Sequence, residues 1–232
     1  MAIINIVNKE GVCMKIFLDT ADISTIKQWA HTGIIDGVTT NPTHLSKAGG
    51  DPKKIIKEIC ELLLHGSVSV EVTELDPDIV YAQAKAISVL ADNITVKIPC
   101  HSRYFEVIKR LVDEDISLNI TLIFTLTQGL AMCKLGVDYI SPFMGRLDDI
   151  GSSGIKLVQD MANMRDTYSY NTELLAASIR SVDQLHEVIL AGADIATVPV
   201  AVLEKAVSHP LTDKGIEKFL ADWQALGIRK FP

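Results

Sequence analysis

Residues 67–98, SVSVEVTELDPDIVYAQAKAISVLADNITVKI, contain the pattern that decides the fold. The segment begins with the β-branched run Ser67–Val72 and ends with a second such run, Ile94–Ile98. Between the two runs, apolar residues recur at the spacing of one helical face: Ile79, Ala82, Ala86 and Leu90. This order predicts a strand, a helix and a second strand, the unit from which parallel sheets are built.

The same alternation repeats along the chain. Strands are expected at Lys15–Leu18, Gly37–Thr39, Ser67–Val72, Ile94–Ile98, Leu118–Leu122, Tyr139–Ser141, Leu174–Ala177 and Ile195–Val198. Helix-like stretches such as Lys53–Leu64 lie between them, and Asp22 and either Thr125 or Thr127 are suited to cap helices. Eight such units in roughly 210 residues predict an α/β fold, a (β/α)₈ TIM barrel. A doubly wound open sheet is the alternative, but no GxGxxG or GxxxxGK[ST] loop follows a strand.

A further helix is expected after the eighth unit, at Thr212–Gln224. Its apolar residues fall on one face: Ile216, Phe219, Leu220 and Trp223. Since the eight units are complete before it, this helix is expected to be an appendage that closes one end of the barrel or packs on a neighbouring subunit. No linker divides the chain. The predicted organisation is therefore an N-terminal extension at residues 1–13 and one barrel domain at residues 14–232 that includes the last helix.

Composition excludes several classes of function. A net charge of −7 and a pI near 5.3 argue against a surface for nucleic acid or an anionic membrane. Four cysteines without CxxC spacing favour free thiols in a reducing, cytoplasmic environment. No apolar run approaches the length of about 18 residues that spans a membrane. Six histidines without HxH or HExxH spacing predict no metal site.

Lys97 is a charged residue within the apolar run Ile94–Ile98. A buried ammonium group must be paired or neutral, and a neutral lysine in an apolar slot can form a Schiff base with a carbonyl substrate. The alternative is an amphipathic edge strand with Lys97 in solvent. The polar residues of the other strands favour the first interpretation.

Seven of the expected strands bring a polar side chain to the end at which barrels of this kind carry their active sites. These residues are Asp19 and Thr20, Thr39 to Asn41, Glu71 and Thr73, Lys97, Asn119 and Thr121, Ser141 with Arg146 beyond it, and Ser178 with Arg180. Polar side chains at the equivalent end of seven strands predict a single functional site at this end of the barrel.

The carboxylates suit the chemistry of a lysine nucleophile. Forming and hydrolysing an imine moves several protons and requires a carboxylate and a positioned water molecule. Asp19 and Glu71 can divide these roles, one as proton shuttle at a substrate hydroxyl and the other as holder of the water. Thr121 would complete the path from that water to the imine. The structural alternative for each carboxylate is a helix cap or a surface group.

A phosphate site is expected beside them. Arg146 and Arg180 follow successive late strands, and Ser178 lies two residues before Arg180. Two guanidinium groups and a hydroxyl suit a dianion, and barrels commonly bind phosphate at the loops after their last strands. The alternative is that the arginines pair with Asp148 or Asp149. The loop at residues 151–154, GSSG, resembles an anion-binding turn but is expected only to begin the sixth helix.

Taken together, the motifs at these strand ends are similar to those of one family. They are FLDTAD (17–22), GVTTNP (37–42), VEVT (70–73), VKIP (96–99), NITL (119–122), SPFMGR (141–146) and AASIR (176–180). From Met14 to about Gly227 the chain resembles the transaldolase family, in particular its short bacterial branch, which also contains fructose-6-phosphate aldolases. The resemblance implies a (β/α)₈ barrel without cofactor or metal. It also implies transfer of a dihydroxyacetone unit from a ketose phosphate to an aldose phosphate.

Roles for single residues follow from the resemblance, motif by motif. Lys97 is implied as the Schiff-base lysine, Asp19 as the acid and base at the donor hydroxyl, and Glu71 with Thr121 as holders of the water. The implied substrate-binding residues are Thr39, Asn41, Ser141 and Phe143, of which Asn41 and Ser141 would bind the dihydroxyacetone hydroxyls. The implied phosphate-binding residues are Arg146, Ser178 and Arg180.

Two positions separate the branches of the family. The aldolase members resemble this chain but have glutamine in place of Glu71 and tyrosine in place of Phe143. The sequence therefore predicts a transaldolase of the pentose phosphate pathway that acts on sugar phosphates; an aldolase using free dihydroxyacetone is the alternative. The short members also imply a homo-oligomer, a pentamer or a pair of pentamers, in which the terminal helix embraces a neighbour.

Overall fold

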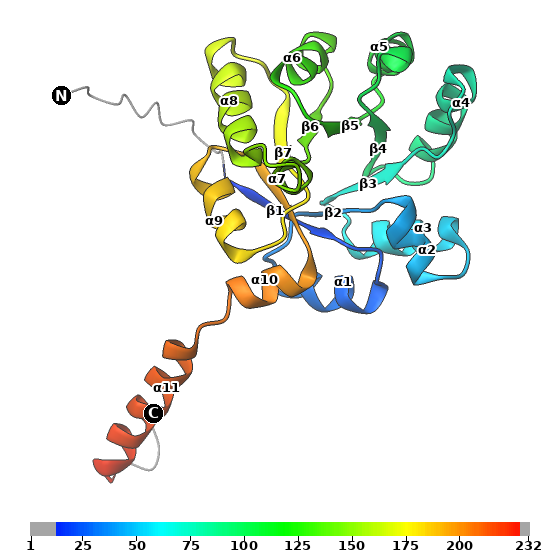
Figure 1. The fold of residues 1–232 in the computed structure, drawn as a ribbon. Coiled ribbons are helices and arrows are strands. Elements are labelled where there is room, and N and C mark those ends of the chain that lie inside the picture. The colour runs from blue at the N-terminus through cyan, green and yellow to red at the C-terminus, as the bar shows by residue number, and fades with distance from the viewer. Residues whose placement is uncertain (1–12, 228–232) are drawn as a thin grey trace, which may run out of the picture.

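The β-branched runs form eight parallel strands, which pair in sequence order and close into a barrel (Figure 1). The computed structural model describes residues 13–227. The strands are β1 (Lys15–Asp19), β2 (Gly37–Thr39), β3 (Ser67–Glu71), β4 (Ile94–Pro99), β5 (Leu118–Ile123), β6 (Tyr139–Pro142), β7 (Glu173–Ala176) and β8 (Ile195–Val198). Every strand expected from the sequence is present, and its ends lie within one residue of the predicted ones. The predicted (β/α)₈ barrel is confirmed.

Helices surround the barrel and connect its strands (Figure 1). Each odd-numbered strand is followed by one helix: α1 (Ile23–Ala30), α4 (Pro77–Ser88), α6 (Leu126–Leu135) and α9 (Val182–Leu190). Each even-numbered strand is followed first by a short helical segment: α2 (Pro42–Ala48), η1 (Ser102–Tyr104), α7 (Met144–Asp148) and α10 (Val200–Ala206). Longer helices come next: α3 (Pro52–Leu62), α5 (Phe105–Asp113), α8 (Gly154–Thr167) and α11 (Pro210–Ala225). The short segments therefore lie at the carboxyl ends of the strands.

Local hydrogen bonds explain where the helices begin. The Asp22 side chain accepts from the backbone N–H of Thr25 and caps α1, as predicted. Thr125, one of the two residues expected, caps α6 and forms a capping box with Gln128. Ser153 caps α8, so the loop at residues 151–154 is the start of a helix, as expected.

The alternation of side chains along each strand separates the core from the barrel interior. Val96 and Ile98 are fully buried in the main apolar core, to which the helices contribute. A separate, smaller apolar cluster of Phe17, Leu175, Ala177 and Ile195 accompanies the polar side chains of the barrel. The parallel register then pairs Glu71 with Lys97 and Lys97 with Asn119. Three polar residues on neighbouring strands are thus placed at one level of the barrel.

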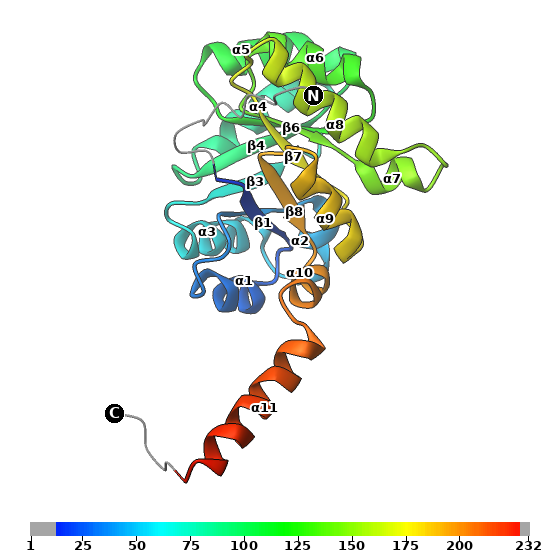
Figure 2. The ribbon, with the colours of Figure 1, turned by 90° about the vertical axis from the view of Figure 1, so that its left-hand side faces the viewer.

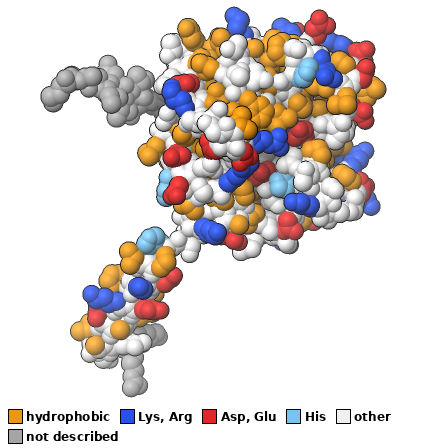
Figure 3. Space-filling model, viewed as in Figure 1, with side chains coloured by type: hydrophobic (Ala, Val, Ile, Leu, Met, Phe, Trp, Pro, Cys, Tyr) orange, Lys and Arg blue, Asp and Glu red, His pale blue; other side chains and the backbone are white. Residues whose placement is uncertain are grey.

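The last helix is the predicted appendage. It runs from Pro210 to Ala225, slightly beyond the expected Thr212–Gln224, and both views show it projecting away from the barrel (Figures 1 and 2). It therefore does not close an end of the barrel. Apolar side chains lie along its exposed surface (Figure 3): Leu211, Ile216, Phe219, Leu220, Trp223 and Leu226.

The expected extension at residues 1–13 lies outside the described residues except for Cys13, so the division at residue 14 stays a prediction. Within the described part of the chain, none of the helices combines the length and the apolar character needed to cross a membrane.

Candidate active site

A cavity of about 520 Å³ opens at the carboxyl ends of the strands. It brings together nine of the residues that the sequence predicts for the site: Asp19, Thr39, Asn41, Lys97, Ser141, Phe143, Arg146, Ser178 and Arg180. The other two predicted residues, Glu71 and Thr121, lie outside its lining. The cavity has further lining residues that were not assigned a role from the sequence: His44, Lys47, Asn119, Leu175, Ala177 and Thr197.

Lys97 lines this cavity from the middle of β4. Its side chain is buried, with the residue only 4% exposed, so the interpretation as a solvent-facing edge residue is wrong. A closed barrel has no edge strand on which such a lysine could reach water. The Nζ atom lies 3.0 Å from Oε2 of Glu71 and donates a hydrogen bond to the backbone oxygen of Thr40 at 3.2 Å. Of the two states expected for a buried lysine, the structure shows the paired one.

Glu71 and Thr121 adjoin the cavity without lining it. The Glu71 side chain is 14% exposed, neither a helix cap nor an open surface group, and meets the lysine from β3. The Thr121 hydroxyl, on β5, is buried and has no hydrogen-bond partner among the described residues. Buried hydroxyl groups are normally satisfied, so this oxygen has unused hydrogen-bonding capacity.

Asp19 stands at the end of β1. Its Oδ1 atom accepts a hydrogen bond from the Thr39 hydroxyl at 3.1 Å, and the Thr39 and Thr197 hydroxyls lie 2.6 Å apart. The same Oδ1 lies 3.3 Å from Nε2 of His44, on α2. Because Asp22 caps α1, Asp19 does not have the capping role that was its structural alternative.

Two of the expected substrate-binding side chains are held by neighbours. Asn41 caps α2, because its Oδ1 accepts from the backbone N–H of His44 at 2.9 Å. The Ser141 hydroxyl donates to Oδ1 of Asn119 at 2.6 Å, and Nδ2 of Asn119 donates to the Ser69 hydroxyl at 3.1 Å. Asn119 therefore fixes the orientation of Ser141, a role that its position in the NITL motif did not reveal.

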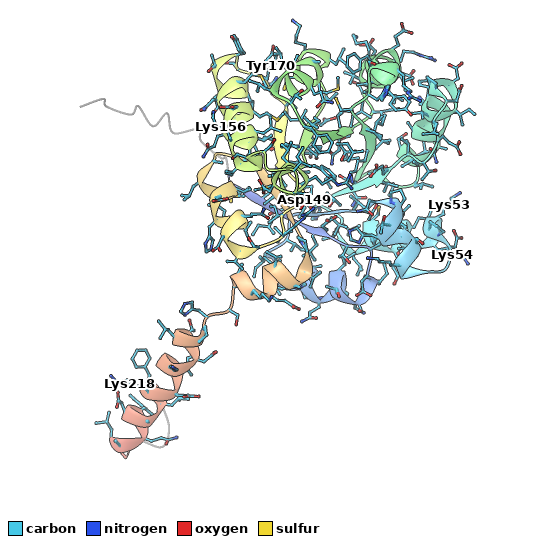
Figure 4. The ribbon with its side chains drawn as sticks, viewed as in Figure 1. Lys53, Lys54, Asp149, Lys156, Tyr170 and Lys218 are labelled. Carbon is cyan, nitrogen blue, oxygen red and sulfur yellow. The ribbon has the colours of Figure 1, made fainter. Side chains whose placement is uncertain are left out.

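The two arginines of the expected phosphate site differ in their contacts. Arg180 forms a two-pronged ion pair with Asp149, the alternative considered from the sequence, with Nη2 donating to Oδ2 at 2.7 Å. Figure 4 places Asp149 beside α7, in the middle of the face shown. The hydrogen bond from Arg180 lowers the pKa of Asp149. The Arg146 guanidinium lies 5.1 Å from the centre of the Phe143 ring, within cation–π range.

The pairing of Arg180 with Asp149 is compatible with the expected phosphate site. Both side chains are about half exposed, at 49% and 52%. An exposed ion pair contributes little to stability because water screens it. Arg180 can therefore exchange Asp149 for another anionic partner at small energetic cost.

The described residues include neither an activated cysteine nor a metal-binding cluster. All four cysteines are free, and burial raises the pKa of Cys60 and Cys100 to about 11, so these thiols stay protonated at neutral pH. Among residues 13–227, no group of three or more histidine, cysteine, aspartate or glutamate side chains is placed to hold a metal ion.

The fold and this cavity define a class of protein: a (β/α)₈ barrel with a buried lysine–glutamate pair at its carboxyl-terminal mouth and arginines at the rim. Residues 16–229 match the family model described as transaldolase/fructose-6-phosphate aldolase. The chain therefore belongs to this family. The prediction that it is an enzyme of the transaldolase type is confirmed.

Similar proteins agree with this assignment. A "Probable transaldolase" from Lactiplantibacillus plantarum is 50% identical over 91% of this chain and 97% of its own. A "Probable transaldolase 2" from Listeria monocytogenes is 47% identical over 94% of this chain and 99% of its own. A solved thiamine phosphate pyrophosphorylase from Pyrococcus furiosus has a TM-score of 0.56 at 17% identity over 82% of this chain and 87% of its own, a likeness in fold alone.

His44 and Lys47 line the cavity but were not predicted from the sequence, because its histidines were considered only as metal ligands. Their positions could have indicated them. Both follow Asn41 on the short helix after β2, three residues apart and so on one face of that helix.

Proposed function

We propose that the protein transfers a dihydroxyacetone unit from sedoheptulose 7-phosphate to glyceraldehyde 3-phosphate, giving erythrose 4-phosphate and fructose 6-phosphate. The observation that carries the proposal is the buried lysine paired with a glutamate in the wall of a polar cavity. Family membership supports sugar phosphates as substrates. This reaction belongs to the pentose phosphate pathway.

In the proposed reaction Lys97 acts as the nucleophile. Its ammonium group first passes a proton to the paired carboxylate of Glu71. The neutral amine then attacks the ketose carbonyl, and loss of water gives an imine. Asp19 takes the proton of the donor hydroxyl while the adjacent carbon–carbon bond breaks and the first aldose leaves. The three-carbon unit then attacks the acceptor aldehyde, and Asp19 returns the proton.

Glu71 and Thr121 act on the water that hydrolyses the imine. Glu71 takes a proton from this water, and the Thr121 hydroxyl orients it toward the imine carbon. The contact of Glu71 with Nζ of Lys97 and the unpartnered hydroxyl of Thr121 support these roles. A glutamate can exchange protons at this position, whereas a glutamine can only hydrogen-bond.

The remaining predicted residues bind the substrate. Thr39, Asn41, Ser141 and Phe143 would contact the dihydroxyacetone unit, and Arg146, Ser178 and Arg180 the phosphate. All seven line the same cavity, and bidentate guanidinium groups are well matched to phosphate.

A fructose-6-phosphate aldolase that uses free dihydroxyacetone is the second candidate, because the matching family contains both activities. Phe143 favours transfer, since a phenyl ring has no hydroxyl to assist release of free dihydroxyacetone.

The test is to trap the donor on the enzyme. With fructose 6-phosphate present, borohydride reduction should leave a stable three-carbon adduct, which peptide mapping should locate at Lys97. A Lys97→Met protein should form no adduct, and if it still turns over, the mechanism is wrong. Coupled assays with and without an aldehyde acceptor separate the candidates, since rapid release of dihydroxyacetone without acceptor would indicate the aldolase.

We also propose a homo-oligomer, a pentamer or a pair of pentamers, in the cytoplasm. The exposed apolar side chains of α11 support association, and the four free cysteines suit a reducing compartment.

A further inference from the structure

His44 is the one imidazole that lines the cavity, among the described residues, and it faces the carboxylate of the proposed proton shuttle. Its Nε2 atom lies 3.3 Å from Oδ1 of Asp19. The two side chains are 27% and 23% exposed, so the contact lies in the cavity wall and not on the open surface. A histidine beside a carboxylate can orient it by donating a ring N–H.

The local backbone holds His44 at this position. Asn41 caps α2 by accepting a hydrogen bond from the backbone N–H of His44 itself. Asp19 is fixed from its other side, because the Thr39 hydroxyl donates to the same Oδ1 atom. The carboxylate oxygen is therefore shared between a hydroxyl donor on β2 and the imidazole on α2.

Charged groups surround this pair on every side of the cavity. The acidic neighbour is Asp19 itself, while Glu71 and Asp149 are each already paired with a basic side chain. The basic groups that line the same cavity are Lys47 on α2, Lys97 on β4, Arg146 on α7 and Arg180 beyond β7.

We propose that His44 is a positioning residue whose Nε2–H donates a hydrogen bond to Oδ1 of Asp19 and holds this carboxylate toward the donor hydroxyl. This inference rests on the transaldolase chemistry proposed above. When the carbon–carbon bond breaks, the hydroxyl proton moves to Asp19. When the acceptor aldehyde is attacked, the same proton returns from Asp19 to the new hydroxyl, so the cycle balances while His44 keeps its own proton.

The hydrogen bond and the bulk of the side chain can be separated at this position. Glutamine at position 44 keeps an N–H donor for Asp19, whereas leucine fills a similar space without one. The rate of transfer should therefore depend on the donor, and KM should change little.

The experiment compares kcat and KM for the wild type, His44→Gln and His44→Leu, with His186→Gln as the matched control on the exposed surface of α9. Glutamine can still donate a hydrogen bond to Asp19, and leucine cannot. We expect kcat of His44→Gln to stay within about three-fold of the wild type and kcat of His44→Leu to fall roughly 10-fold or more, with KM within about two-fold in both. His186→Gln should behave as the wild type.

Three outcomes would overturn the inference: a His44→Leu protein with the rate of the wild type, equal losses of kcat in His44→Gln and His44→Leu, or a change in KM alone. Borohydride trapping on Lys97 is measured in every variant and separates the two proposals. If the wild type forms no adduct, the proposed function has failed. If adducts form normally and the rates of the variants equal that of the wild type, only the role of His44 is wrong.

Discussion

At the scale of single residues, Lys97 and Glu71 determine what the site can do. They face each other from β4 and β3 with Nζ and Oε2 3.0 Å apart, and both are largely buried. Removing one charge of such a pair leaves the other without its partner in a poorly solvated place, which is strongly unfavourable. A substitution at either position should therefore affect both stability and chemistry.

Glu71→Gln is the direct test of this pair. We expect transfer to slow roughly 100-fold, because an amide cannot take the proton of the hydrolytic water. The free energy of unfolding should fall by about 3 kcal/mol, the lower end for a broken buried pair. Steady-state assays and urea unfolding measure the two effects separately. Glu74→Gln, three residues along on the exposed loop, is the control and should change neither; unchanged turnover in Glu71→Gln would exclude a proton-transfer role.

Gly145 packs against two of the side chains proposed to bind phosphate. A Cβ atom at this position would lie 2.2 Å from the backbone oxygen of Ser178 and 3.0 Å from Nε of Arg180. Ser178 has a φ of 63°, in the left-handed region that non-glycine residues rarely adopt. The segment that carries Ser178 and Arg180 therefore has little freedom to move away.

Gly145→Ala should displace this segment and weaken phosphate binding. We expect KM for a ketose phosphate to rise roughly 10-fold, with about 1–3 kcal/mol lost from overpacking. Adduct formation from unphosphorylated dihydroxyacetone should change little, since Lys97 is untouched. Gly215→Ala on α11, where an added Cβ meets nothing within 4 Å, is the matched control. Equal losses with both substrates would show that the phosphate end is not where Gly145 acts.

At the scale of elements, the barrel is built from pairs of strands. An Asp or Asn stands directly before each even-numbered strand: Asp36, Asn93, Asp138 and Asp194. The three aspartates each accept a hydrogen bond from a backbone N–H of the preceding odd-numbered strand. The donors are Ile16 to Asp36 at 2.8 Å, Leu118 to Asp138 at 2.8 Å and Leu174 to Asp194 at 2.7 Å. Asn93 instead donates to backbone oxygens of Leu63 and Gly66, ahead of β3.

Asp194 has a second task that Asp138 lacks. Its carboxylate also binds Arg165 of α8, which is 6% exposed and further contacts Asp166 and the backbone oxygen of Gly192. Asp194→Ala should cost about 3–5 kcal/mol because it breaks a buried ion pair. Asp138→Ala should cost about 1–3 kcal/mol, the penalty of one unsatisfied backbone N–H. Urea unfolding of the two variants side by side measures the difference, and equal losses would mean that Arg165 adds nothing.

The strands were predictable because their signal is local: short β-branched runs predicted every strand, with its ends within one residue of the observed ones. The motifs at the strand ends likewise placed nine residues in one cavity. The pairing of Arg180 with Asp149 and the approach of His44 to Asp19 could not be decided from sequence, because each joins segments that only the closed barrel brings together. The Asp or Asn before each even-numbered strand is visible in the sequence. Its hydrogen-bond partner cannot be predicted until the strand register is known.

At the scale of the whole molecule, the cavity and the apolar surface of α11 are separate. Every residue that lines the cavity comes from a barrel strand or from the segment that follows one, the short helices α2 and α7 included. Helix α11 projects away from the barrel (Figures 1 and 2). Phe219 is 72% exposed, Leu220 56% and Ile216 53%. Large apolar side chains gathered on one element mark a surface that binds another protein, and a neighbouring copy of the chain is the occupant proposed above.

Phe219→Glu combined with Ile216→Glu should therefore dissociate the oligomer without disabling the chemistry. Two carboxylates placed in an apolar contact would each have to be buried without a partner, at a cost that exceeds what the lost apolar contacts could offset. Sedimentation velocity should show the wild type at several times 25.4 kDa and the double variant near that mass. Lys218→Glu on the same helix (Figure 4) is the control for added negative charge and should leave the assembly intact.

Borohydride trapping at Lys97 should proceed in all three proteins, because the cavity lies within one chain. A wild type that sediments as a monomer would refute the proposed assembly, and loss of trapping in the dissociated variant would show that a neighbouring copy is needed to complete the site.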